Sequence, residues 1–255
     1  MLQYPISFSV GNNQYLLHGF FEFLAFFVAF RYYLFLRKKN NDSITTNNRI
    51  WIIIGAIFGS TIGSRLIGGL EDFNQLQIAD NKLVHFYLNK TVLGGFLGGL
   101  FGVELIKKII KEKSSSGDLF TYPMILGLII GRIGCFSMGV FEETYGTTTT
   151  FFTGMNLGDN KLRHPVTLYE IGFLILLWIV IIQFEKKYVF THGFRFKIFM
   201  ITYILFRLFL DFIKPHYTLF IGLSTIQITS LIGLLYYSFV FYQNNKKQFY
   251  KKLLL

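Results

Sequence analysis

The sequence predicts an all-α integral membrane protein with seven transmembrane helices. Hydrophobic residues make up 52% of the 255 residues and charged residues only 15%, which is less charge than a soluble domain usually carries. The hydrophobic residues also come in blocks of about 20, the length of helix that crosses a hydrocarbon core. The blocks cover roughly 17–36, 51–70, 92–110, 122–140, 168–184, 196–213 and 219–242. We therefore expect one polytopic membrane domain over residues 1–255.

The distribution of positive charge predicts the orientation of these helices. The loops on one side, together with the tail after residue 242, hold sixteen Lys and Arg, whereas the opposite side holds five. Lysine and arginine accumulate on the cytoplasmic side of membrane proteins. We therefore expect the N-terminus outside, the C-terminus in the cytoplasm, and no nucleic-acid partner despite the net charge of +11. The first block is long enough to be a full span, so no cleavable signal peptide is expected.

The segment 141–167 has the composition of a folded outer loop. It is rich in Gly, Asn and Asp and ends near Pro165, and these residues favour turns over helix. Proline is tolerated in the first turn of a helix. We therefore expect Pro165 to mark the start of the fifth helix.

Arg65, Arg132 and Arg207 lie inside hydrophobic blocks, at mid-depth or in the outer half of the predicted spans. An arginine at that depth costs at least about 2.5–3.5 kcal/mol and is usually paired or functional. Glu104 and Asp211 are acids at similar depth. Two interpretations remain open: the acids neutralise the arginines and fix helix packing, or the arginines bind an anionic headgroup, for which the planar guanidinium is well suited.

Two other patterns favour structure over chemistry. Glycines recur four residues apart between Gly94 and Gly102, which is typical of a tight crossing of two membrane helices. The five histidines are scattered without paired spacing, so no metal site is predicted.

Three strings in the chain resemble the prolipoprotein diacylglyceryl transferases. They are Gly131-Arg132-Ile133-Gly134-x-Phe136, Arg163-His164-Pro165-x-x-Leu168-Tyr169-Glu170 and Leu205-Phe206-Arg207-x-Phe209-x-Asp211-Phe212. The paired glycines at 94–99 match that family as well, and the matches run in order over about residues 20–240. The family has seven spans with the N-terminus outside, in agreement with the charge distribution.

The resemblance implies a reaction and its partners. The family transfers a diacylglyceryl group from phosphatidylglycerol, or a related anionic phospholipid, to the lipobox cysteine thiol in the signal peptide of a lipoprotein precursor. A thioether forms and glycerol-1-phosphate leaves, without a metal or cofactor, at the bacterial plasma (inner) membrane. Arg132 and Arg207 would bind the lipid phosphate, with Arg65 as a further charge at the same depth. The expected supporting residues are Gly131, Gly134, Glu104, Asp211, Tyr169 and Glu170.

The chain also departs from the family pattern. Cys135 stands where an Asn is usual, Met138 and Val140 replace a second Asn and a Glu, and Leu97 replaces a His. The polar residues that could take over are Glu142, Glu143, Tyr145 and His164, with His164 or Glu143 as the proton acceptor and Tyr145 as a further catalytic candidate. The alternatives are a protein that binds or transports an anionic lipid without chemistry, and a membrane assembly factor with a vestigial pocket.

Overall fold

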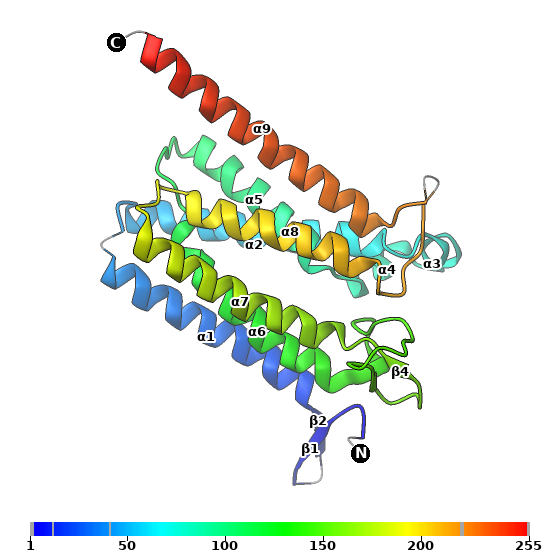
Figure 1. The fold of residues 1–255 in the computed structure, drawn as a ribbon. Helices are drawn as coiled ribbons and strands as arrows, with labels where there is room; N and C mark the ends of the chain where they lie inside the picture. Colours follow the sequence, from blue (N-terminus) through cyan, green and yellow to red (C-terminus); the bar gives the residue numbers. More distant parts are fainter. Residues whose placement is uncertain (1–2, 12, 41, 220–221, 254–255) are drawn as a thin grey trace. The chain divides into compact units, whose positions relative to one another are not determined.

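A computed structural model describes residues 3–11, 13–40, 42–219 and 222–253 of the protein, and helices dominate it (Figure 1). The chain divides into two compact units. The first comprises residues 1–43, 115–199 and 212–215, and the second comprises residues 44–114, 200–211 and 216–255.

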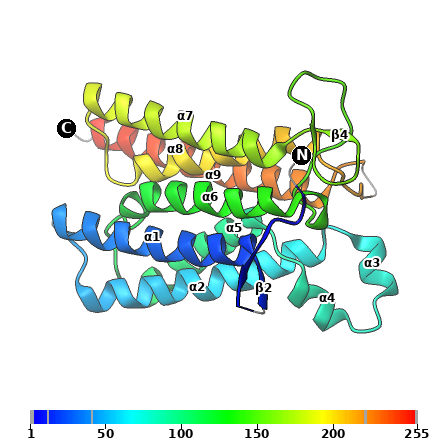
Figure 2. The same ribbon diagram turned by 90° about the horizontal axis from the view of Figure 1, so that it is seen from below.

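The first unit is built around three long helices that lie side by side. They are α1 (Leu17–Lys39), α6 (Asp118–Met138) and α7 (Val166–Lys187). α6 packs against both of the others, as Figures 1 and 2 show. Aromatic stacking supports the contact of α1 with α6, since the rings of Tyr33 and Phe120 lie 4.4 Å apart between centroids.

A short hairpin precedes α1 and joins it to the end of α6. Its strands are β1 (Ser7–Val10) and β2 (Asn13–Leu16), which pair antiparallel. The backbone N–H of Ile6 donates to the carbonyl of Ser137 at 2.8 Å, and Leu17 N–H donates back to Ile6 at 3.0 Å. These bonds bring the start of α1 close to the end of α6.

Glycine ends α6 for a steric reason. Gly139 has φ of +59°, and a Cβ atom there would lie 2.2 Å from the carbonyl oxygen of Leu157. Only glycine fits such a position without strain. The chain then forms a single 3-10 turn, η1 (Gly139–Phe141), and enters the loop that holds β3 (Met155–Asn156) and β4 (Leu162–Arg163). The loop ends at Pro165, which precedes the first residue of α7 as predicted.

The second unit is built on a pair of helices in unusually close contact, α2 (Thr46–Gly69) and α5 (Val92–Ile109). Glycines of one helix face glycines of the other in antiparallel register. The facing pairs are Gly55 with Gly102, Gly59 with Gly98, and Gly63 with Gly94. The tight crossing predicted for the glycines of α5 is therefore confirmed, and its partner is α2.

The other helices of this unit are shorter or follow later in the chain. α3 (Phe73–Ile78) and α4 (Lys82–Leu88) connect α2 to α5 (Figure 2). The side chains of Asp72 and Asn81 cap them by accepting backbone N–H bonds at 3.0 Å. α8 (Phe194–Asp211), which belongs to this unit from Met200 on, and α9 (Thr225–Leu253) complete the described helices.

Five helical segments within the described residues are long and apolar enough to cross a membrane. They are Leu17–Lys39, Thr46–Gly69, Asp118–Phe141, Val166–Lys187 and Thr225–Gln243. α5 and α8 also form at predicted blocks, with 18 residues each. The described chain is thus helical and of the kind expected for an integral membrane protein. The count of seven spans, the orientation of the termini and the single-domain organisation stay predictions.

Two features differ from the sequence-based expectation. The last block was expected to begin at 219, but α9 begins at Thr225 because the chain turns first: Leu219 N–H donates to Leu223 at 2.9 Å, and Gly222 has φ of +72°. The hairpin at residues 7–16 was not expected either, since its hydrophobic alternation is too short to stand out.

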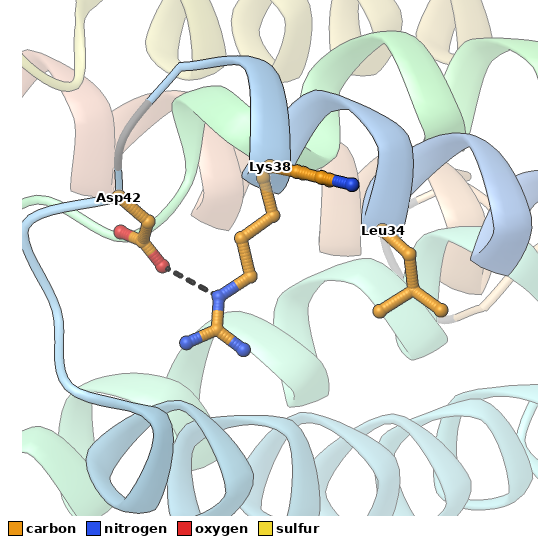
Figure 3. Close-up of a pocket in the computed structure, with 4 residues that line it drawn as sticks. Leu34, Lys38 and Asp42 are labelled. Atoms are coloured by element: carbon orange, nitrogen blue, oxygen red, sulfur yellow. Dashed lines mark hydrogen bonds and ion pairs between the residues drawn. The ribbon is translucent and has the colours of Figure 1, made fainter.

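Figure 3 shows a surface hollow at the C-terminal end of α1, lined by Leu34, Arg37, Lys38 and Asp42. Arg37 Nε lies 3.2 Å from Asp42 Oδ2 across it. This hollow is at the opposite end of α1 from His18, so it contributes nothing to the site described next.

The glycine contact between α2 and α5 yields a direct test. A Cβ at Gly59 would lie 2.3 Å from the carbonyl oxygen of Gly98, whereas one at Gly95 would meet Ser64 Cβ at an ordinary 3.6 Å. We expect Gly59→Ala to lower the free energy of unfolding in detergent by about 1–3 kcal/mol, and Gly95→Ala to change it little. Equal stability of the two variants would contradict this packing.

Candidate functional site

The centre of the site is a buried ion pair between α6 and α7. Arg132 is 7% exposed and Glu170 is 2% exposed. Nε of Arg132 lies 2.9 Å from Oε1 of Glu170. Arg132 is near the end of α6 and Glu170 is in the first turns of α7, so the contact follows from the packing of the two helices. Glu170 was expected as a supporting residue, and the structure brings it directly onto the arginine.

The guanidinium of Arg132 also reaches the residue that departs from the family pattern. Its Nη1 donates to Sγ of Cys135 at 3.6 Å, one helical turn further along α6. The sulfur is a weaker acceptor than the oxygen of an asparagine amide. The guanidinium is therefore ion-paired at Nε and makes a weaker contact at Nη1.

A second group of polar side chains adjoins Cys135. His18, at the start of α1, lies with Nδ1 3.1 Å from Oε2 of Glu142. Its other ring nitrogen, Nε2, is 3.8 Å from Oε2 of Glu22, one turn along the same helix. Donor atoms of His18, Cys135 and Glu142 all lie within 4.8 Å of one another. The site thus has a cationic part at Arg132 and an imidazole–carboxylate part beside it.

Close backbone contact explains how residues far apart in the sequence meet here. A Cβ at Gly134 would lie 3.2 Å from the carbonyl oxygen of His18 and 3.0 Å from Cβ of Phe21. Gly134 therefore lets α6 approach α1 at the residue that bears the imidazole. The glycine at 139 then turns the chain so that Glu142 returns towards His18. Gly131 is less constrained, because its Cβ would meet only Ala25, at 4.0 Å.

Sequence reasoning missed His18 and weighed Glu142 only as one of several polar candidates. The usable signal was indirect: a histidine at the start of a hydrophobic helix and a glycine able to bring a second helix against it. The expectation that no metal ligands gather was also incomplete, since nitrogen, sulfur and oxygen donors meet here. The Arg132 cation next to the sulfur opposes the binding of a second cation.

The three predicted catalytic residues lie in the loop after α6. His164 Nδ1 lies 3.1 Å from the hydroxyl of Tyr169, which also forms a hydrogen bond with Thr153. The guanidinium of Arg163 stacks 4.8 Å above the ring of Tyr145. Both His164 and Tyr145 thus have contacts that hold the loop together. Their roles in catalysis, like that of the exposed Glu143, stay predictions.

An ion pair further braces this loop. Arg163 Nη2 lies 2.7 Å from Oδ2 of Asp159, and its Nη1 donates to the carbonyl of Gly146 at 3.3 Å. The hydrogen bond from Arg163 lowers the pKa of Asp159, so this pair is fully charged at neutral pH. The short strands β3 and β4 are held together at this point.

The second unit contains the other two arginines of the prediction. Arg207 is buried in α8, and Asp211, one turn later, accepts a hydrogen bond from the hydroxyl of Ser224. The guanidinium of Arg65 lies 4.6 Å from the centre of the Tyr87 ring. Phosphate binding by Arg207 and Arg65 stays a prediction.

The acid expected to support these arginines has a different partner. Glu104 lies in α5 with its carboxylate 3.2 Å from Nζ of Lys107, one turn along the helix, and it is about half exposed. Its position in a hydrophobic block suggested that Glu104 is buried. The last turn of α5 is basic, however, and Lys107 in that turn pairs with the carboxylate. A supporting role for Glu104 in lipid binding stays a prediction.

The buried pair predicts strong energetic coupling. Glu170→Gln leaves the Arg132 guanidinium buried without its counter-charge, and we expect the free energy of unfolding to fall by about 3–5 kcal/mol. The double variant Arg132→Met/Glu170→Gln should recover more than half of that loss, measured by reversible unfolding in detergent at neutral pH. Glu143→Gln is the matched control, because its carboxylate is exposed. If the double variant instead loses as much stability as Glu170→Gln and Arg132→Met lose together, the two residues are not coupled.

Comparison with known proteins assigns the chain to a family. Residues 5–243 match the family model described as prolipoprotein diacylglyceryl transferase. A phosphatidylglycerol–prolipoprotein diacylglyceryl transferase of Wolbachia pipientis subsp. Culex pipiens is 32% identical over 70% of this chain and 68% of its own length. Proteins of the same name from Campylobacter hominis and Rickettsia felis are 28% and 29% identical, over 82% and 95% of this chain and 78% and 97% of their own lengths. The chain belongs to the prolipoprotein diacylglyceryl transferase family.

Proposed function

We propose that this protein transfers a diacylglyceryl group from phosphatidylglycerol to the lipobox cysteine of a lipoprotein precursor in the bacterial plasma membrane. Family membership and the names of the relatives support the reaction. The single structural observation that carries the proposal is the buried Arg132, oriented by Glu170. A guanidinium held in this way is a suitable ligand for the phosphate of an anionic lipid.

The chemistry requires little more than charge stabilisation and removal of one proton. The thiolate sulfur attacks the sp³ carbon of the diacylglyceryl group, a C–S bond forms, and the C–O bond to phosphate breaks. The electron pair of that bond stays on the phosphate oxygen of glycerol-1-phosphate. A fixed cation near this oxygen stabilises the developing charge. Because the carbon under attack is not a carbonyl, no oxyanion hole is needed.

We assign Arg132 as the principal phosphate ligand, and Arg207 and Arg65 as further ligands for the anionic headgroup. The burial of Arg207 supports its role, since a cation inside a membrane helix usually has a function. The assignment of Arg65 has the least support of the three, because its guanidinium already stacks on the ring of Tyr87. In this proposal α5 and α8 also cross the membrane, which gives seven spans with the N-terminus outside, and the loop between α6 and α7 faces outward.

The second candidate function is binding or transport of an anionic lipid without chemistry. The replacement of the family's usual Asn, Glu and His by Cys135, Val140 and Leu97 favours it. The two candidates predict the same lipid ligand but different products. Formation of a thioether therefore separates them.

The test uses the full-length protein in vesicles that contain phosphatidylglycerol, with a lipobox peptide as acceptor and mass spectrometry of the thioether product. We expect product with the wild type. Arg132→Ala and Arg207→Ala should lower the rate on the order of 10²-fold or more. Arg207→Lys should remain impaired, because an ammonium cannot donate in a plane to two phosphate oxygens.

Arg37→Ala is the charge-matched control, since Arg37 pairs with Asp42 at the other end of α1. This variant should keep the wild-type rate. Wild-type protein that binds phosphatidylglycerol but forms no thioether would support the non-catalytic alternative. Full activity of Arg132→Ala would remove the central assignment.

A further inference from the structure

We propose that His18, paired with Glu142, is the group that accepts the proton of the incoming thiol. The inference rests on the proposed transferase function and names its proton acceptor. It differs from the sequence-based choice of His164 or Glu143. Its basis is the geometry around Arg132, because the proton must leave the thiol close to the place where the phosphate is held.

The imidazole lies one side chain away from the proposed phosphate ligand. Arg132 Nη1 is 3.6 Å from Cys135 Sγ, and this sulfur is within 4.8 Å of donor atoms of both His18 and Glu142. The attacking sulfur and the phosphate flank the same carbon atom during the reaction. A base for that sulfur must therefore lie near the phosphate ligand, and only the side chain of Cys135 separates His18 from Arg132.

The pairing with Glu142 suits the imidazole for this task. His18 Nδ1 meets Oε2 of Glu142 at 3.1 Å as an ion pair, without the alignment of a full hydrogen bond. A carboxylate on one ring nitrogen favours the tautomer whose other nitrogen can accept a proton, and it stabilises the imidazolium that forms. The remaining nitrogen, Nε2, is 3.8 Å from Glu22, beyond hydrogen-bond distance.

Partial exposure leaves the imidazole accessible to a substrate. The side chain of His18 is 20% exposed, and that of Glu142 is 31% exposed. The charged or titratable groups that face this imidazole are Glu22 on its own helix, Cys135 and Arg132 on α6, and Glu142 after it. Both carboxylates favour the protonated ring, whereas Arg132 opposes it.

The step balances with these groups alone. The S–H proton of the acceptor peptide moves to Nε2 of His18, and the sulfur electron pair forms the C–S bond. The C–O bond to phosphate breaks, and glycerol-1-phosphate leaves with that electron pair. The imidazolium then returns its proton to the released phosphate or to water. This arrangement supplies the proton acceptor that the replaced family residues no longer provide.

The experiment measures thioether formation in phosphatidylglycerol vesicles as a function of pH. His18→Gln and Glu142→Gln should lower kcat on the order of 10²-fold, with KM for phosphatidylglycerol unchanged because Arg132 is intact. The deficit of His18→Gln should shrink as the pH approaches about 8.5, where a free thiol ionises without help. A purely structural role for His18 would not produce this recovery at high pH.

The matched control is His192→Gln, because His192 is exposed in the turn between α7 and α8. It should keep the wild-type rate and pH profile. Thermal unfolding of each variant in detergent shows whether the fold is kept. If His18→Gln does not fold, Glu142→Gln carries the test through the same fall in kcat at constant KM.

Three results would overturn the proposal. One is full turnover by His18→Gln. Another is loss of turnover in His164→Gln while His18→Gln stays active, which would favour the loop histidine. The third is loss of wild-type turnover on chelation with recovery on adding Zn²⁺, which would make His18, Cys135 and Glu142 metal ligands. Failure of the proposed function is distinct, because the wild type itself would then form no thioether.

Discussion

The site depends on one constraint: a guanidinium inside a hydrophobic helix must be compensated. Arg132 meets this requirement through Glu170, and the two side chains are almost completely buried. Truncating either partner would leave a charge in an apolar environment, which is far more costly than losing an exposed ion pair. The pair therefore fixes the guanidinium and at the same time joins α6 to α7. Nη1 of the same guanidinium donates to Sγ of Cys135.

Glycine makes the rest of the first unit's site possible. Gly134 admits the backbone of α1 at His18, and Gly139 turns the chain so that Glu142 reaches the same imidazole. In the second unit the glycines have a different role, because facing pairs of them let the backbones of α2 and α5 approach closely. Close approach of helices replaces the hydrophobic driving force that is absent between helices in lipid.

Much of the architecture could be predicted from hydrophobic block length and from the position of Pro165, because these depend on local sequence. Arg132 could be predicted as a site residue as well, because a charged residue in the middle of a hydrophobic block is conspicuous in the sequence. The contact of His18 with Glu142 could not, because it depends on how two helices and a turn meet in space. The start of α9 was wrong by six residues, from 219 to Thr225, because a turn centred on Gly222 interrupts a continuous hydrophobic run. The pair of Glu104 with Lys107, by contrast, is local, because residues three apart are neighbours on one face of a helix.

The most direct measurement is the affinity of the purified protein for lipid, by native mass spectrometry, with phosphatidylglycerol and with diacylglycerol, which lacks the phosphate. If Arg132 binds the phosphate, Arg132→Ala should weaken binding of phosphatidylglycerol about tenfold or more, which corresponds to roughly 1.4 kcal/mol. Binding of diacylglycerol should be unchanged, because the apolar contacts of the acyl chains remain. Equal loss for both lipids, or no loss for phosphatidylglycerol, would contradict the assignment of Arg132 as the phosphate ligand.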